Sequence, residues 1–171
     1  SHPDSLRNPK RRENPAGTMM NRRSRSPGGR GRSLVLYCSR TGNTERVARQ
    51  IRTVLDCDML EVEPAVPYED DYNAMLERAQ EELAAIRQGD YPAVATYVEH
   101  FDDYDTVFVG YPIWYGSMAS PMQAFLYAHA SELAGKRIAL FATSGSSGVS
   151  ASVGEARSLC PDAEFTEVLH L

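Results

Sequence analysis

The sequence predicts an α/β fold with a doubly wound parallel sheet, and three observations support this prediction. Short apolar runs rich in β-branched and aromatic residues, typical of strands buried on both faces, recur along residues 33–171. Segments in which apolar residues have helical spacing separate these runs. Strands that alternate with helices form βαβ units, whose right-handed crossovers place helices on both faces of one sheet.

The chain of 171 residues divides into a basic tail and one domain. Residues 1–32 hold nine Lys and Arg against two acidic residues, a net charge of +7, and show no apolar period. We expect this tail to be disordered, because it cannot bury enough apolar surface to offset its ordering entropy. Since residue 1 is Ser, part of the tail is expected to be a cloning remnant, with Met19 or Met20 as a candidate start. Residues 33–171 have a net charge of −12 and the length of a single domain.

The first half of the domain is predicted to contain two strands and two helices. Residues 33–38 and 57–62 are the strands, since both are short and mostly apolar. Residues 43–55 are the first helix, with apolar positions on one stripe. Residues 68–88 form the second helix, which has acidic residues in its first turn and Gly89 after its end.

The second half continues the alternation of strands and helices. Strands are predicted at residues 106–111, 136–143 and 164–171, and helices at residues 118–130 and 150–159. In doubly wound sheets a ligand binds beyond the carboxyl ends of the strands, at the point where the strand order reverses. We therefore looked for chemistry in the loops that follow the first, third and fourth predicted strands.

The loop after the first strand is predicted to bind a phosphate group. It combines three hydroxyl side chains with Gly42, which lets a ligand approach the backbone closely, and it leads into a helix N-terminus. The candidate residues are Ser39, Arg40, Thr41, Gly42, Asn43 and Thr44.

Other phosphate chemistries fit this loop poorly. The G-x-x-x-x-G-K-[ST] motif of nucleotide hydrolases is absent, and no G-x-G-x-x-G follows the strand. A phosphatase nucleophile at Cys38 would need a clamping Arg, but Thr44 stands six residues later. A plain turn with a hydroxyl cap on the helix stays open as an alternative.

The loops after the third and fourth strands suit a flat heterocycle. The first of them contains the only Trp of the chain beside a Tyr, and planar rings stack on such side chains. The second offers glycines and hydroxyls that can hydrogen-bond the edge of a ring. For the first loop, the alternative is that the Trp only packs under the loop. For the second loop, the alternative is a flexible linker. The candidate residues are Pro112, Ile113, Trp114, Tyr115, Gly116, Thr143, Ser144, Gly145, Ser147 and Gly148.

Taken together, these loops resemble those of the flavodoxin-like proteins, in their short bacterial-type branch. The run S-R-T-G-N-T at residues 39–44 is similar to the phosphate loop of that family. The runs V-G-Y-P-I-W-Y-G at 109–116 and A-T-S-G-S-S-G at 142–148 are similar to the two loops that flank the isoalloxazine ring. E-P-A-V-P-Y at 63–68 is also similar, and the resemblance extends over residues 33–171.

The resemblance implies a cofactor, a sheet order and a partner class. It implies FMN, a five-stranded sheet in the order 2-1-3-4-5, and electron transfer with a redox partner protein that has a basic docking surface. The net charge of −12 agrees with such a partner. No catalytic side chain is expected, because the flavin carries the redox chemistry. We expect Arg40 to point into solvent.

Two alternatives and one departure accompany this interpretation. The same fold serves NAD(P)H-dependent quinone or flavin reductases, and a module that has lost FMN is a third class. The family normally has one more helix after the fifth strand. The sequence given ends at Leu171, so we expect the terminal helix to be missing and one sheet face to be partly uncovered.

Composition excludes several other classes. No run of 18 apolar residues exists, so no membrane span is expected. Three Cys residues without a C-x-x-C pair, and histidines without ligand spacing, predict no metal site and a reducing, cytoplasmic location. A domain with a net charge of −12 would repel nucleic acid.

Overall fold

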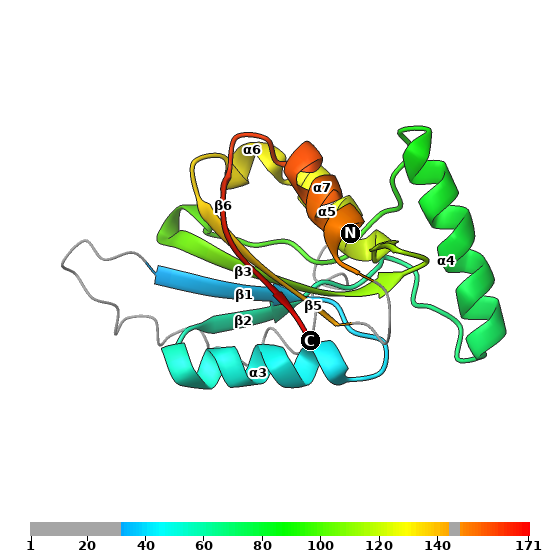
Figure 1. Cartoon of the computed structure of the whole chain (residues 1–171), viewed down its shortest axis with the longest axis horizontal. Helices are drawn as coiled ribbons and strands as arrows, with labels where there is room; N and C mark the ends of the chain where they lie inside the picture. Colours follow the sequence, from blue (N-terminus) through cyan, green and yellow to red (C-terminus); the bar gives the residue numbers. More distant parts are fainter. Residues whose placement is uncertain (1–31, 144–147) are drawn as a thin grey trace.

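The computed structural model describes residues 32–143 and 148–171, which form a sheet with helices on both faces (Figure 1). The strands are β1 (Arg32–Tyr37), β2 (Asp58–Glu61), β3 (Tyr104–Trp114), β4 (Ser117–Met118), β5 (Arg137–Thr143) and β6 (Glu164–His170). The helices are α3 (Asn43–Leu55), α4 (Tyr72–Arg87), the 3-10 turn η2 (Phe101–Asp103), α5 (Ser120–Ala128), α6 (Ala130–Leu133) and α7 (Ser150–Leu159). Nearly all of the predicted tail, together with Ser144, Gly145 and Ser147, lies outside the described residues.

The sheet confirms the predicted fold class and strand order. Its path is β2-β1-β3-β5-β6, and all neighbouring strands on this path are parallel. Numbered as the five predicted strands, this order is 2-1-3-4-5. The sequence analysis did not predict β4, a two-residue strand antiparallel to the end of β3, because two residues are too few to show a strand period.

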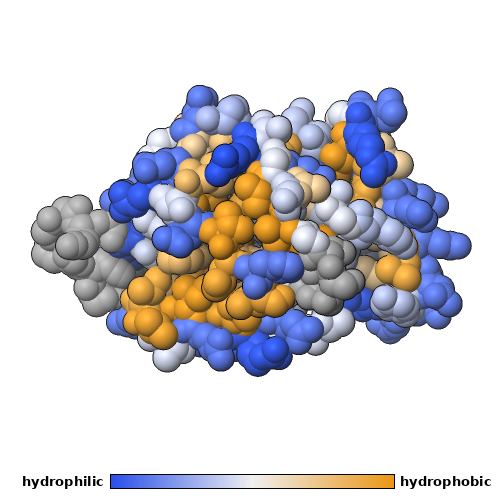
Figure 2. All heavy atoms as spheres, in the orientation of Figure 1, coloured by the Kyte–Doolittle hydropathy of each residue, from blue (hydrophilic) through white to orange (hydrophobic). Residues whose placement is uncertain are grey.

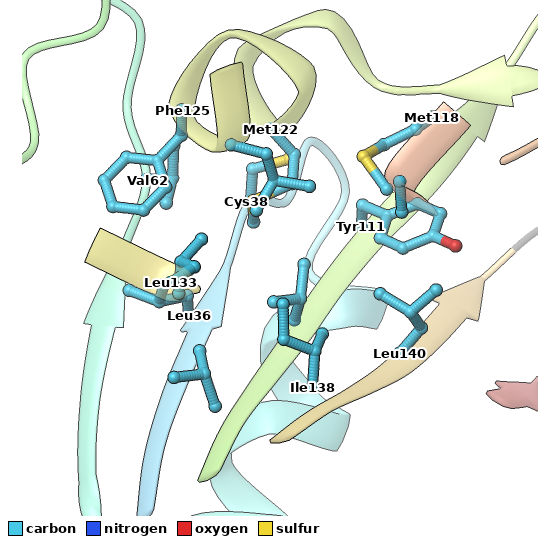
Figure 3. Packing of buried hydrophobic residues seen from close by; sticks show 14 of the residues in the cluster. Leu36, Cys38, Val62, Tyr111, Met118, Met122, Phe125, Leu133, Ile138 and Leu140 are labelled. Carbon is cyan, nitrogen blue, oxygen red and sulfur yellow. The ribbon is translucent and has the colours of Figure 1, made fainter. Parts of the chain in front are cut away.

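The larger core lies between the sheet and α5, α6 and α7. Side chains from the strands, such as Leu36, Tyr111 and Leu140, meet Met122 and Phe125 of α5 there (Figure 3). These strand residues are almost fully buried. This face therefore supplies most of the apolar burial that stabilises the domain.

The opposite face carries a smaller core beneath α3. Val35, Tyr37, Ala48 and Phe141 form its buried cluster. Leu169 of β6 stands in register with Phe141, yet half of its surface is exposed. Figure 2 shows apolar residues gathered over α3 and the sheet beside it. Among the described residues this face is thus only partly covered.

Some predicted boundaries move in the structure. β1 begins at Arg32, which the sequence analysis had placed in the tail. α4 begins at Tyr72 rather than at residue 68, because the Asp71 carboxylate accepts a hydrogen bond from Ala74 N and caps the helix there. β3 continues to Trp114, so Pro112, Ile113 and Trp114 lie at a strand end rather than in a loop.

Candidate functional site

A pocket of about 510 Å³ lies where the strands of the parallel sheet end. A pocket of this volume is large enough for a small organic cofactor. Its lining comes from the loop after β1, from α3 and α4, from the ends of β3 and β5, and from Leu171 after β6. The lining residues are Arg40, Thr41, Asn43, Thr44, Arg46, Val47, Tyr72, Met75, Leu76, Pro112, Ile113, Trp114, Thr143 and Leu171.

One end of the pocket is formed by residues 39–44, which we call the hydroxyl loop. Gly42 adopts φ 98°, the left-handed region that favours glycine, and a Cβ at this position would meet nothing within 4 Å. Ser39 Oγ accepts hydrogen bonds from the N–H groups of Gly42 at 3.1 Å and Glu45 at 3.4 Å. The loop is therefore held in shape by its own residues and leads directly into α3.

The hydroxyl loop is joined to the end of β5 through two threonine side chains. Thr44 Oγ1 and Thr143 Oγ1 are 2.8 Å apart, and Thr44 is buried. Both residues also line the pocket. The structure thus brings together two predicted loops that are separated by 99 residues in the sequence.

Two arginines line the same end of the pocket. Arg40 is half-buried, its Nη2 donates to the Asp70 carbonyl at 3.4 Å, and its Nε is buried without a hydrogen-bond partner among the described residues. The expectation that Arg40 points into solvent is therefore wrong. Arg46 Nη1 donates to Asn43 Oδ1 at 3.2 Å. Two guanidinium groups beside a helix N-terminus suit a doubly charged phosphate.

The other end of the pocket contains Trp114, at the start of a tight hairpin. Trp114 pairs with Ser117 across the turn Tyr115-Gly116, and both turn residues have positive φ, 53° and 79°. Two such residues form the type I′ turn that suits a two-residue hairpin. Glu155 of α7 accepts a hydrogen bond from Met118 N at 2.8 Å and fixes the second strand of the hairpin.

Trp114 and Tyr115 are not equivalent in the structure, although the sequence analysis paired them. Trp114 is half-buried and lines the pocket. Tyr115 is 52% exposed, lies outside the lining, and its hydroxyl is 3.5 Å from the Leu76 carbonyl. A ring bound in the pocket would therefore meet the indole rather than the phenol.

The outer wall of the pocket is α4, which sequence reasoning missed. Tyr72, Met75 and Leu76 line the pocket, whereas the sequence analysis predicted only a helix at residues 68–88. Tyr72 is 62% exposed, so it forms part of the rim. α4 packs against α5. Figure 1 shows α4 at the right, beyond the ends of the strands. The acidic first turn of the predicted helix did not indicate that the helix would form a wall of the pocket.

The candidate residues fall into three groups. Those that line the pocket are Arg40, Thr41, Asn43, Thr44, Pro112, Ile113, Trp114 and Thr143. Those outside the lining are Ser39 and Gly42, which shape the hydroxyl loop, Tyr115 and Gly116, which form the turn, and the exposed Gly148. Ser144, Gly145 and Ser147 lie outside the described residues and stay predictions.

The described residues contain neither an activated cysteine nucleophile at Cys38 nor a cluster of metal ligands. Full burial raises the pKa of the Cys38 thiol well above its usual value, so it is protonated at neutral pH and a poor nucleophile. Within residues 32–143 and 148–171 no group of three or more His, Cys, Asp or Glu could hold a metal ion. None of the described helices is long and apolar enough to cross a membrane.

The residues that line the pocket suit FMN in chemistry and in charge. The hydroxyl loop, the start of α3 and Arg40 Nε, which has no hydrogen-bond partner within residues 32–143 and 148–171, suit the phosphate. Trp114 and the apolar residues Met75 and Leu76 suit the flat face of an aromatic ring. A polar, cationic end and an aromatic end in one pocket are what a phosphorylated heterocycle requires.

Comparison with known proteins places the chain in a family. A family model described as flavodoxin (Flavodoxin_4) matches residues 32–170. A protein assigned as a flavoprotein from Bacteroides eggerthii is 32% identical and has a TM-score of 0.72, with 82% of this chain and 87% of that chain covered. A flavoprotein from Lactobacillus acidophilus, solved in complex with FMN, is 23% identical and has a TM-score of 0.70, with 82% and 93% covered. No curated protein sequence matches the chain significantly. The chain therefore belongs to the flavodoxin family.

Proposed function

We propose that this protein transfers electrons to or from a redox partner protein through FMN held in the pocket of the hydroxyl loop and Trp114. The observation that carries the proposal is the pairing, in one pocket of about 510 Å³, of a cationic, hydroxyl-rich end with an aromatic end. The L. acidophilus flavoprotein of the same fold, solved with FMN, supports this choice of ligand. When bound, FMN supplies the one- and two-electron redox chemistry.

The residues of the chain bind and orient the cofactor. Thr41, Asn43 and Thr44 would donate hydrogen bonds to the phosphate, while Arg40 and Arg46 would neutralise its charge. Because residues 39–44 are already held by Ser39, little ordering entropy would be lost on binding. Trp114 would stack against the ring and exclude water from one of its faces.

The surface beside the pocket supports a protein partner with a basic docking surface. Glu69, Asp70 and Asp71 are exposed between the hydroxyl loop and α4, and the Asp70 carbonyl accepts the hydrogen bond from Arg40. Glu77 and Glu81 of α4 are also exposed and add to the negative charge of this helix. A cluster of one charge sign steers an oppositely charged partner toward the cofactor and speeds their encounter.

One observation favours a second candidate, an NAD(P)H-dependent quinone or flavin reductase. Tyr72 stands exposed on the rim, where its ring could stack on a flat substrate beside the flavin. The two candidates differ in what reduces the flavin, namely a partner protein or a dissociable nicotinamide nucleotide.

A pair of reduction assays separates these candidates. The purified protein is loaded with FMN and mixed anaerobically with NADPH and a quinone, with or without a flavodoxin reductase. We expect flavin reduction only when the reductase is present, at a rate that falls with added salt because docking is electrostatic. Rapid quinone turnover with NADPH alone would contradict the electron-carrier function and favour the quinone or flavin reductase. A purified protein that neither carries nor takes up FMN would contradict both candidates.

A further inference from the structure

A group of four interlocked side chains, Tyr68, Arg78, Glu82 and Ser120, contacts Trp114 through the ring of Tyr68. Tyr68, in the loop before α4, meets the indole edge to face, with ring centroids 5.5 Å apart and planes at 86°. This T-shaped arrangement is one of the two preferred geometries of aromatic pairs. Tyr68 is not among the residues that line the pocket, so it could act on a ligand there only through Trp114.

The phenol of Tyr68 is fixed by residues of two helices. Its hydroxyl donates to Glu82 Oε1 of α4 at 2.5 Å. Ser120 Oγ, at the start of α5, donates to the same carboxylate oxygen at 2.7 Å and lies 3.1 Å from the phenol oxygen. Burial and the Glu82 carboxylate both raise the pKa of Tyr68, so the phenol stays a neutral donor.

Arg78 closes the group around the ring of Tyr68. Its guanidinium carbon lies 4.2 Å from the ring centroid, and its Nε donates to Glu82 Oε2 at 3.1 Å. The other two nitrogens donate to the carbonyls of Pro67 and Val66 at 2.7 and 2.5 Å. Both charged side chains are mostly buried, with 19% and 14% exposed, so this pair is screened less than a surface pair.

We propose that Tyr68 is a positioning residue, held by Glu82, Ser120 and Arg78, that fixes the indole of Trp114 at the wall of the pocket. Trp114 ends β3 next to the turn Tyr115-Gly116 and is half-buried in the folded domain. Tyr68 covers the indole from behind and limits the rotamers it can adopt. A ring fixed in advance costs less entropy on ligand binding. The part of this inference that concerns FMN rests on the proposed function.

The lone tryptophan makes this proposal testable without the cofactor. Trp114 is the only Trp of the chain, so all indole emission reports on its surroundings. The variants are Tyr68→Leu, which removes the aromatic edge, Tyr68→Phe, which keeps it, and Glu82→Gln, which weakens the hold on the phenol. Tyr127→Phe is the matched control, because that tyrosine is exposed on α5 and stacks on Tyr91.

Emission maximum, anisotropy and acrylamide quenching are measured on each apoprotein, together with urea unfolding. We expect Tyr68→Leu to raise the quenching constant about twofold and to lower FMN affinity about threefold, the size of one aromatic contact. Tyr68→Phe should keep the quenching constant and the FMN affinity close to those of the wild type. For Glu82→Gln, both quantities should lie between those of Tyr68→Phe and Tyr68→Leu. The Tyr127→Phe control should change neither.

Trp114 emission and quenching that are unchanged in folded Tyr68→Leu would overturn the proposal. If that variant does not fold, unchanged emission and quenching in Glu82→Gln would overturn it instead. Failure of the wild type to bind FMN would contradict the proposed function, while the indole signals of the apoproteins would still decide the role of Tyr68.

Discussion

The two ends of the pocket are built in different ways. The hydroxyl loop and Arg46 come from one stretch of eight residues, held by Ser39 and by the left-handed conformation of Gly42. The aromatic end combines the end of β3 with α4, and Tyr68 of the preceding loop supports it from behind. One end is thus determined by local sequence, and the other by packing between distant elements.

This difference determines how each end should respond to mutation. A change in the hydroxyl loop alters backbone groups that would contact the ligand directly, so its effect on affinity should be large and its effect on stability small. A change at the aromatic end should alter affinity less, because several side chains share that contact. The variants below compare the two ends, from the largest expected effect to the smallest.

Gly42→Val should have the largest effect. Nothing would obstruct the new side chain, but a β-branched residue at φ 98° is strained, and relief of that strain moves the loop. Strain and one lost charge-assisted hydrogen bond together predict about a 100-fold loss of FMN affinity. Equilibrium dialysis measures the loss, and urea unfolding checks that the domain remains folded. FMN retention at wild-type affinity would show that the phosphate does not lie in this loop.

Replacing both arginines, Arg40→Gln with Arg46→Gln, should weaken FMN binding about 30-fold, the effect of two solvent-screened ion contacts of about 1 kcal/mol each. The wild-type affinity should also fall with added salt, because salt screens charges that are not fully buried. Titrations at two ionic strengths measure both effects, and the double variant should show the weaker salt dependence. Riboflavin, which lacks the phosphate, is the control ligand, and equal losses for FMN and riboflavin would argue against a phosphate contact.

Trp114→Ala should lower FMN affinity about tenfold, through lost stacking and lost apolar burial. Tyr115→Ala is its matched neighbour and should change affinity by less than about twofold, since Tyr115 is exposed and outside the lining. We also expect Trp114→Ala to shift the reduction potential of the bound flavin more than Tyr115→Ala does. Spectroelectrochemistry of both variants compares the shifts. Equal effects of the two changes would mean that the turn, rather than the indole, contacts the ring.

Deletion of residues 1–31 should have the smallest effect. Their composition predicts no contribution to the core, so flavin content and melting temperature should stay close to those of the full chain. The deletion keeps Arg32, whose guanidinium lies 3.7 Å from Asp58 and 3.5 Å from Asp103. A clear drop in either quantity would show that the tail takes part in the domain.

The same contrast explains what the sequence could predict. The strands followed from apolar runs such as residues 33–38, and the doubly wound sheet from the rules for βαβ connections. The strand order, in contrast, was implied by the resemblance to flavodoxin-like proteins, and the sheet confirms it. The hydroxyl loop could be located because its residues are contiguous and stand at a strand end. Trp114 could be located for the same reason, as the only Trp beside a predicted switch point.

The wall formed by α4 could not be predicted in the same way. Tyr72, Met75 and Leu76 fit a helical stripe, and such a stripe does not say which surface it faces. That surface is set by the packing of α4 on α5 and by the contacts of Arg78 to the preceding loop. Arg46 was missed for a related reason, since a lone arginine on an amphipathic helix usually faces solvent.

The central claim is that FMN binds with its ring against Trp114 and its phosphate in the hydroxyl loop. Titration of the apoprotein with FMN, followed by the emission of its single tryptophan, tests this claim most directly. We predict quenching that saturates at one FMN per chain, and far weaker quenching by riboflavin at the same concentrations. Binding of FMN that leaves Trp114 emission unchanged, or equal affinity for riboflavin, would contradict the account.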